Sequence, residues 1–411
     1  IYVTGYLKSL HEMAVAPQDV PWYSADFFRR LRFSLASAIF RQDDARSALT
    51  AALLVGDKSR LLPAQRETLA RGGISHLFSI SGLHLGLVAG YGYHLLLLGW
   101  RRSERLLLNF PPRRYLPLAL IPLLLFYLMV TGGALPTLRA FFMAFVGILL
   151  WLSGWRTRPL NLVWTAAFIF ILTHPLLIFD VSFQLSFAAV TAIVACVGRW
   201  ASFCRDYPRC LRWFCLLGVT TLVASLATVP LVLANFHLLA PAGLLTNFFA
   251  VPAIALLALP LGLAAAALLP MWPTAAQGLL SVVHPVLGMV EDATAWMIAG
   301  PIFGGWRLFL SPGQIWGIAL VVLALMLPLR LRYAWAARIA AMGLCLVFFL
   351  WSLFPSGDTR RLTVTAVSVG QGDATLLSFG DTRHILVDGG GLYSDHFDVG
   401  ERLVAPALGH I

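Results

Sequence analysis

Long apolar runs, separated by short polar stretches rich in arginine, dominate the middle of the chain. The first clear run covers residues 83–100, and others cover 115–130, 138–152, 160–179, 185–197 and 213–235. A helix needs about 20 apolar residues to cross the hydrocarbon core of a bilayer, and these lengths lie close to that value. The pattern predicts a series of membrane-spanning helices.

Two later segments, 244–269 and 278–299, leave two solutions open. Pro252 and Pro260 interrupt the first, and Glu291 and Asp292 lie in the second. Either both are single spans, or the first is a broken re-entrant segment and the second lies at the interface with wet carboxylates. Runs at 315–329 and 339–354 follow. We therefore expect a polytopic α-helical membrane protein of roughly 8 to 10 membrane segments, at least one of them broken or interfacial.

The flanking segments follow different patterns. Residues 25–75 carry apolar positions at helical spacing, with arginines near their edges, so we expect a helical region lying on the membrane surface or packed on the spans. Its outer basic surface comprises Arg29, Arg30, Arg32 and Arg41. After residue 355, short alternating runs at 362–369, 374–379 and 383–387 predict three strands of a partial β-rich domain.

Composition narrows the class of protein. Hydrophobic residues make up 59% of the chain and charged residues 12%, which excludes an ordinary soluble enzyme and a disordered chain. The net charge is +11, and Lys8 and Lys58 are its only lysines. Arginine suits phosphate oxygens, so nucleic acid and anionic lipid are both candidate partners, although codon bias produces the same preference.

Arginine-bearing loops alternate with arginine-free loops along the spans. They lie at 101–114, 156–158 and 199–212, and cytoplasmic loops accumulate such residues. These loops are therefore predicted to be cytoplasmic, and the soluble parts at both ends extracytoplasmic. Long segments translocate with little regard to charge, which accommodates the arginines of 25–75.

The cysteines and the first residue carry weaker signals. Cys196, Cys204, Cys210 and Cys215 contain no Cys-x-x-Cys pair, so we expect four unlinked thiols rather than a zinc site or a disulfide frame. The chain begins with Ile1 rather than Met, and we interpret it as a fragment of a longer protein.

The densest polar cluster lies just before the first span, in residues 72–86. Ser75, Ser79, Gly82 and Gly86 recur every three or four residues, a spacing that permits close helix packing or forms a polar wall. His76–Gly86 closely resembles the Ser-His-Leu-x-x-Ile-Ser-Gly-Leu-His motif of ComEC-type competence proteins. Residues 136–140 resemble the Pro-x-x-Arg-Ala element of that family, and residues 180–187 its Asp-x-x-Phe-Gln-Leu-Ser-Phe element.

This resemblance implies a channel for single-stranded DNA in the bacterial inner membrane, used in natural transformation. It also implies a separate DNA receptor outside and a cytoplasmic ATPase motor, since the chain has no nucleotide-binding loop. A phosphate on every nucleotide requires a water-filled path through lipid. Candidate path residues are His76, Ser79, Ser81, Gly82, His84, Arg139, Asp180, Gln184, Ser186, Asn235, His237 and Asn247. Arg139 could equally snorkel to the headgroups, and Asp180 could pair with it or cap a helix.

The ends of the chain resemble other domains of the same family. Residues 369–374 and 386–390 resemble the entry to its metallo-β-lactamase-like domain, through Gln371, Gly372, Asp373 and Asp388, although Ser368 stands where the family has its first acid. The His-x-His-x-Asp-His ligand motif is absent, so we assign no catalytic residue, metal ligand or cofactor. Degradation of the other strand with a divalent metal, zinc or manganese, is expected only of the longer protein.

The predicted domains follow from these assignments. They are the end of an OB-like domain at 1–20, the amphipathic region at 25–75, the channel at 76–355 and the incomplete terminal domain at 360–411. Two alternative functions stay open. Ser81 beside His84 suggests an intramembrane serine protease, and the proline-interrupted segment 244–269 suggests a small-solute secondary transporter.

Overall fold

The computed structural model describes residues 25–42, 45–154, 158–200, 202, 204–326, 333–351, 362–369, 372–379, 383–391, 400 and 404–405. The chain divides into two compact units. Unit 1 comprises Ile1–Thr221 and Ala240–Gly305, and unit 2 comprises Leu222–Leu239 and Trp306–Ile411. Helix α10 (Arg209–Phe236) runs from the first unit into the second.

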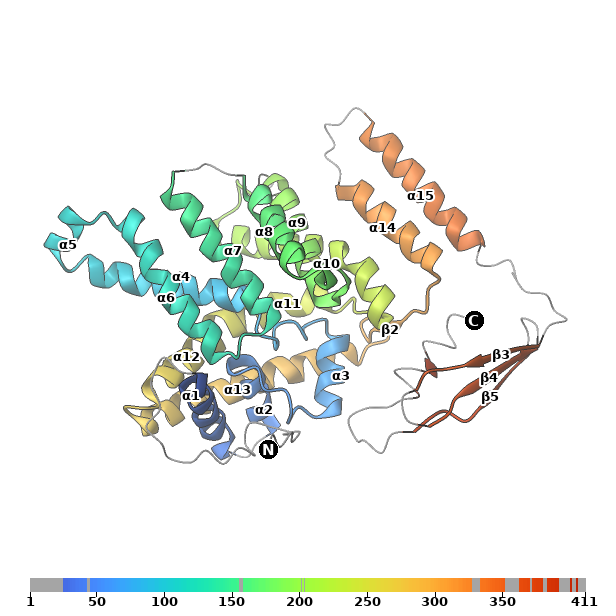
Figure 1. The fold of residues 1–411 in the computed structure, drawn as a ribbon, viewed down its shortest axis with the longest axis horizontal. Coiled ribbons are helices and arrows are strands. Elements are labelled where there is room, and N and C mark those ends of the chain that lie inside the picture. Colours follow the sequence, from blue (N-terminus) through green and yellow to red (C-terminus); the bar gives the residue numbers. More distant parts are fainter. Residues whose placement is uncertain are drawn as a thin grey trace. The chain divides into compact units, whose positions relative to one another are not determined.

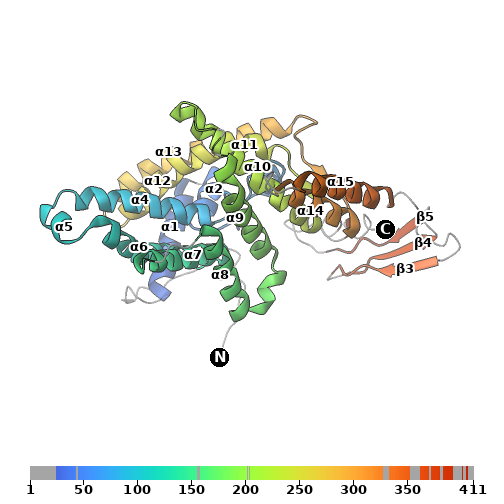
Figure 2. The same cartoon turned by 90° about the horizontal axis from the view of Figure 1, so that it is seen from above.

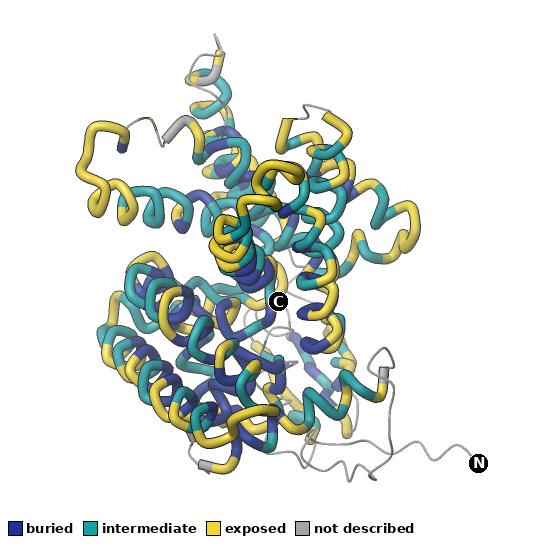
Figure 3. Tube along the Cα trace, turned by 90° about the vertical axis from the view of Figure 1, so that its left-hand side faces the viewer, coloured by how far each residue is buried: buried dark blue, intermediate teal, exposed yellow. Residues whose placement is uncertain are grey.

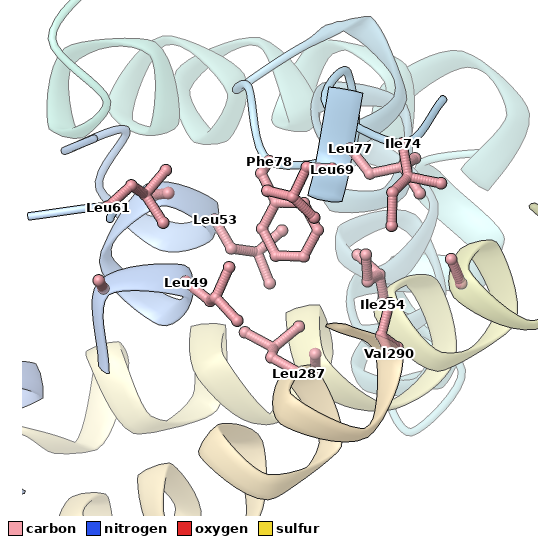
Figure 4. Close-up of a cluster of buried hydrophobic side chains, with 14 of the residues drawn as sticks. Leu49, Leu53, Leu61, Leu69, Ile74, Leu77, Phe78, Ile254, Leu287 and Val290 are labelled. Carbon is pink, nitrogen blue, oxygen red and sulfur yellow. The ribbon is translucent and has the colours of Figure 1, made fainter. Parts of the chain in front are cut away.

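Two groups of helices, distant in sequence, build one apolar core in unit 1. The first group is α1 (Ala25–Ile39), the 3-10 turn η2 (Phe40–Gln42), α2 (Ala45–Leu54) and α3 (Pro63–Arg71). The second is α11 (Gly243–Pro252), the π-helical η4 (Ala253–Ala258), α12 (Leu259–Leu268) and α13 (Pro273–Ile298). Leu49 and Leu53 of α2 meet Ile254 and Leu287 there, and Figure 4 shows this cluster. Helix α1 packs its apolar face against helices α12 and α13.

A second layer of unit 1 contains the apolar helices between residues 82 and 200. They are α4 (Gly82–Trp100), the short α5 (Glu104–Asn109), α6 (Pro112–Val130), α7 (Leu135–Leu152), α8 (Pro159–Thr173), the 3-10 turn η3 (Pro175–Phe179) and α9 (Val181–Trp200). Helices α4 and α6 lie side by side in Figures 1 and 2, and α7 contacts both α4 and α8. The predicted run 160–179 breaks at His174, because a residue before proline avoids the helical conformation.

Six helices of the described chain are long and apolar enough to span a membrane. They are α4, α6, α7, residues 181–198 of α9, α10 and the combined 243–268. Shorter apolar helices cover 159–173, 312–326 and 335–350. Large apolar side chains such as Trp164, Leu172 and Leu323 are exposed. Figure 3 colours exposed residues yellow, and many of them lie on the helices. Lipid is the solvent that would cover such surfaces.

The prolines of 243–268 do not break it. Pro252 ends α11, Pro260 lies in the first turn of α12, and the π-helical η4 joins the two helices. Proline has no backbone N–H to donate, and a π-helical stretch accommodates the hydrogen bonds that are lost in this way. The segment 243–268 is therefore continuous, as the first predicted solution expects of it, and the transporter alternative loses the feature that suggested it.

The acids of α13 face polar partners. Nε2 of Gln65 in α3 donates to Glu291 at 3.1 Å, and the guanidinium of Arg46 in α2 lies 3.8 Å from the carboxylate of Asp292. Helix α13 is not among the six candidate spans. The segment 243–268 follows the first predicted solution and α13 follows the second, so neither solution is confirmed as a whole.

Unit 2 contains two small sheets and a helical pair. Strand β1 (Leu238–Leu239) pairs antiparallel with β2 (Trp306–Arg307), and α14 (Pro312–Met326) packs along α15 (Ala334–Trp351). Strands β3 (Leu362–Ala366), β4 (Thr375–Phe379) and β5 (Arg383–Val387) form an antiparallel sheet in that order. Thr375 of β4 lies between Ala366 and Val387 in the register. The three predicted strands are confirmed.

The expectation of four unlinked thiols is wrong. Cys204 and Cys215 form a disulfide between the loop after α9 and the second turn of α10, while Cys196 and Cys210 are not disulfide-bonded. Spacing failed to indicate the pair because the first turns of α10 fold back toward the loop. Disulfides persist in oxidising compartments, whereas the arginines of this loop predict the cytoplasm, so the two signals disagree on its side of the membrane.

Candidate functional site

The segment joining α3 to α4 is held against α11 by close backbone contact. Gly73 has a φ of +69°, and a Cβ atom there would lie 2.8 Å from the Cα of Gly243. The hydroxyl of Thr246 donates to the carbonyl of Gly72 at 2.7 Å. Only glycine tolerates both this conformation and this approach. The contact fixes where the following residues, 74–81, enter the interior.

Ser81 and His84 form the start of α4. The backbone N–H of Ser81 donates to Nδ1 of His84 at 3.4 Å, and its hydroxyl lies 3.2 Å from the same nitrogen. Because Nδ1 accepts, the ring proton lies on Nε2. His84 is 1% exposed, and its Nε2 has no hydrogen-bond partner among the described residues. The Nε2–H group of His84 is therefore a buried donor in the first turn of α4.

Helix α7 begins against the same segment. The hydroxyl of Thr137 donates to the carbonyl of Ile80 at 3.3 Å, and a side-chain carbon on Gly82 would lie 3.3 Å from Cβ of Ala140. Gly82 therefore permits the close crossing of α4 and α7. Thr137 and Ala140 flank Arg139, so this crossing also sets the position of the arginine.

Arg139 reaches from α7 to the first turn of α9. One guanidinium nitrogen, Nη2, donates to the carbonyl of Ser182 at 2.9 Å and to its hydroxyl at 3.0 Å, and Cζ lies 5.9 Å from the ring centre of Phe183. The residue is only 2% exposed, so it does not snorkel to the headgroups. Nε and Nη1 have no hydrogen-bond partner among the described residues. Two nitrogens of a buried cation, which carry three N–H groups between them, are thus uncommitted.

The predicted acid of this region has two roles. The Asp180 carboxylate accepts the backbone N–H of Phe183 at 2.7 Å and so caps α9, and its charge also attracts Arg139. Gln184 turns away, since its amide donates to the carbonyl of Ile178 at 2.8 Å. Of the residues predicted here, Asp180 therefore acts on Arg139 through its charge, and Gln184 bonds elsewhere.

Three separate sequence segments, 72–86, 136–140 and 180–187, therefore converge in unit 1. Thr137 joins the first to the second, and Arg139 joins the second to the third. The Competence protein family matches residues 53–335, a range that contains all three segments. The chain belongs to this family.

Three relatives match this chain, one over most of its length and two over about half of it. ComE operon protein 3 of Bacillus subtilis (strain 168) is 26% identical over 385 residues, which cover 88% of this chain and 46% of that protein. Competence protein ComA of Neisseria gonorrhoeae is 32% identical over 216 residues, covering 48% and 30%. Recombination protein 2 of Haemophilus influenzae is 28% identical over 225 residues, covering 52% and 27%.

The chain thus spans less than half the length of these curated relatives. No solved structure matches it. The six apolar helices and the family together identify the chain as a membrane protein.

The other predicted path residues are dispersed. His76 is exposed and its Nδ1 lies 3.1 Å from the carbonyl of Gly73, while Ser79 and Ser186 are half-buried. Asn247 of α11 is 7% exposed, with no partner for Oδ1 in the described part of the chain. In unit 2, the Asn235 amide donates to the carbonyl of Leu231 in its own helix. His237 lies against Phe309, at 5.2 Å between ring centres.

The arginines of α1 and its end divide into two kinds. Arg29 pairs with Asp26 on the surface, Arg41 is exposed and Arg30 is half-buried. Arg32 turns inward, where its Nε donates to the carbonyl of Val55 at 3.1 Å. Burial lowers the pKa of Arg32, and the nearby charge of Asp57 opposes that shift. Arg32 therefore holds α1 to the α2–α3 loop.

The motif residues of the terminal sheet lie in two adjoining loops. The carbonyl of Asp373 accepts the N–H of Gly390 at 2.9 Å, and the exposed Asp388 accepts two glycine N–H groups. Gly372 has a φ of +90° and closely approaches Gly391, while Gln371 lies outside the described residues. Among the residues described, no group of three His, Cys, Asp or Glu side chains could hold a metal. The described residues of this domain do not supply the metal site of the resembled domain, and we derive no step from one.

Several contributors to this site were not selected from the sequence. Thr137 and Ser182 stand inside the recognised segments, but serine and threonine are common in membrane helices and give no signal alone. Gly73, Gly243 and Thr246 hold the motif segment against α11. Thr246 and its partner Gly72 are 174 residues apart in the sequence. For Gly73, Thr137 and Ser182, their position inside the motif segments was the only available signal.

Proposed function

We propose that this chain forms the membrane-embedded part of a channel that passes single-stranded DNA across the bacterial inner membrane during natural transformation. The observation that carries the proposal is the meeting of three distant polar segments around the buried Arg139. A charge inside a membrane protein is expensive to bury and usually marks a functional path. The names of its relatives link the family to competence and recombination.

Arg139 suits a passing phosphate chemically. Two nitrogens of its guanidinium, Nε and Nη1, are uncommitted, and arginine binds phosphate oxygens with paired hydrogen bonds. His84 adds a neutral N–H donor nearby on α4. Both side chains are sealed from solvent here, so on this proposal the structure is a closed state. DNA would pass only after α4, α7 and α9 separate.

The partners belong to the proposal as well. DNA movement needs a source of force, and the sequence contains no nucleotide-binding loop. We therefore propose a separate cytoplasmic ATPase and an outer DNA receptor, with the chain's soluble ends extracytoplasmic. The terminal sheet would begin the metallo-β-lactamase-like domain, and its divalent metal stays a prediction for the longer protein.

Uptake of labelled single strands by competent cells tests the channel. Arg139→Ala and His84→Leu, displayed at normal levels in the full-length protein, should each lower uptake roughly tenfold or more, since a hydrogen bond to a charged group contributes about 1.5–3 kcal/mol. Arg101→Ala, which removes an exposed arginine after α4, should leave uptake within about twofold of the parent. Unchanged uptake in both interior variants would remove these residues from the path.

One observation favours a second candidate, an intramembrane serine hydrolase. The Ser81 hydroxyl lies within hydrogen-bond distance of Nδ1 of His84. That nitrogen also accepts the Ser81 backbone N–H, which is the geometry of a helix cap. Labelling by a fluorophosphonate that disappears in Ser81→Ala would support hydrolysis. Absence of labelling would mean that Ser81 and His84 serve only as the helix cap.

A further inference from the structure

A cavity of about 420 Å³ lies beside the core of unit 1 and is not part of the Arg139 site. Its polar wall consists of Lys58, Ser59, Arg66 and Ser75. Its apolar wall consists of Leu61, Leu69 and Phe78, which belong to the cluster in Figure 4. A cavity of this size accommodates a nucleotide-sized group.

The polar wall offers donors and positive charge together. Nη2 of Arg66 donates to the carbonyl of Lys58 at 2.7 Å, which fixes the guanidinium beside the lysine. Nε of Arg66 and the hydroxyl oxygen of Ser59 are buried without a hydrogen-bond partner in the described structure. Buried donors without partners are costly, so a ligand that accepts from them would be stabilised.

The positive charge of this wall is not neutralised from within. None of the described lining residues is acidic. Asp57, the adjacent acid, accepts the backbone N–H of Ser59 and acts on Arg32 instead, while Glu67 pairs with Arg71. Burial lowers the pKa of Lys58, and the charge of Arg66 lowers it further. Two cations forced together in this way favour an anion between them.

We infer that this cavity binds a phosphate group of a DNA strand, through Lys58, Arg66 and the hydroxyls of Ser59 and Ser75. Phosphate matches the donors because it accepts several charge-assisted hydrogen bonds at once. Anionic lipid headgroups offer the same chemistry. The apolar wall, however, is part of a closed core, with Leu69 2% and Phe78 1% exposed, and has no open apolar surface for acyl chains.

The choice of DNA rests on the proposed function. Ser75 and Phe78 of the wall belong to the segment that continues directly into Ser81 and α4. A DNA strand held in the cavity would therefore contact the same segment, 72–86, that leads to the Arg139 site. The phosphate chemistry itself does not depend on the channel.

Protection of Lys58 tests the site directly. The full-length protein, with Lys8→Arg, is placed in phosphatidylcholine nanodiscs and treated with an amine-acylating reagent, and Lys58 is followed by peptide mass. Oligothymidylate at ten times its dissociation constant should slow acylation of Lys58 roughly tenfold, and inorganic phosphate should compete with it. Protection by added phosphatidylglycerol but not by oligothymidylate would overturn the DNA assignment. Protection by neither would overturn the site.

A matched pair of variants gives a second measurement. Arg66→Gln should weaken oligothymidylate binding about tenfold or more and reduce the slope of log K against log salt by about one. Arg60→Gln makes the same charge change nearby, where Arg60 lies over the Phe40 ring, and should stay within about twofold. Equal binding by Arg66→Gln and the parent, with equal thermal unfolding, would contradict the inference.

Failure of this site and failure of the channel look different. If Arg139→Ala abolishes uptake while Lys58 is never protected, the cavity assignment alone is wrong. If Lys58 is protected by oligothymidylate while Arg139→Ala and His84→Leu leave uptake unchanged, the channel proposal is wrong and the phosphate site stands.

Discussion

The interior around Arg139 and the surface of α1 carry the same guanidinium group in two different settings. Arg139 is 2% exposed and is bonded to a neighbouring helix, whereas Arg29 pairs within its own helix and its side chain is 63% exposed. Burying an ion costs several kcal/mol unless its contacts compensate, while an exposed ion pair contributes about 0–1 kcal/mol. In the interior, charge therefore holds helices together, and on α1 it is available to a partner. Changes in the two regions should differ accordingly in size.

The largest effect is expected where the interior is most tightly packed. Gly73→Val should lower the free energy of unfolding by about 2–4 kcal/mol, because valine disfavours the positive φ and its Cβ would collide with Gly243. Thermal unfolding in nanodiscs measures this change. A Cβ at Gly86 would meet no atom within 4 Å, so Gly86→Ala should be neutral or slightly stabilising. Similar losses in both variants would show that the interior is not specially tight.

An intermediate effect is expected at the partner of Arg139. Ser182→Ala removes the hydroxyl acceptor but keeps the carbonyl, so stability should fall by about 1 kcal/mol and DNA uptake a few-fold. Ser186→Ala, one turn further along α9, should change stability by less than about 0.5 kcal/mol. If the two serine variants behaved alike, the bond between Arg139 and Ser182 would contribute nothing measurable.

The smallest effect on stability is expected at the surface. Arg29→Gln and Arg41→Gln should each change the free energy of unfolding by less than about 0.5 kcal/mol. Each should still reduce the salt dependence of DNA binding, with a slope smaller by up to about one. Denaturation and binding at several salt concentrations measure the two quantities. A large stability loss without a change in slope would erase the contrast with Arg139.

The local parts of this fold were predictable from the sequence. Apolar runs indicated the helices 82–100, 112–130 and 135–152, and alternation indicated the three terminal strands, because both patterns repeat within a few residues. Contacts between segments were not predictable in this way. Thr137 and Ile80 are separated by 57 residues, and Arg139 and Ser182 by 43. Nothing in either local pattern reports its partner, and the cavity between Lys58 and Ser75 arises from the same kind of long-range packing.

The disulfide of Cys204 and Cys215 makes the sidedness prediction testable. The arginines of 199–212 predict that the exposed thiol of Cys210 faces the cytoplasm. A membrane-impermeant maleimide should then label Cys210 in inverted vesicles and not in spheroplasts. Labelling in spheroplasts would place the loop and its disulfide outside, and it would reverse the predicted orientation of the spans.

Photocrosslinking during uptake tests the central claim most directly, namely that DNA passes where α4, α7 and α9 meet. A photoreactive amino acid replaces either Ser182, at this meeting point, or Trp164, an exposed residue of α8 with 58% of its surface accessible. Cells importing labelled single strands are then irradiated. The account predicts crosslinks to DNA at position 182 and none at position 164. Crosslinks at 164 without any at 182 would contradict it.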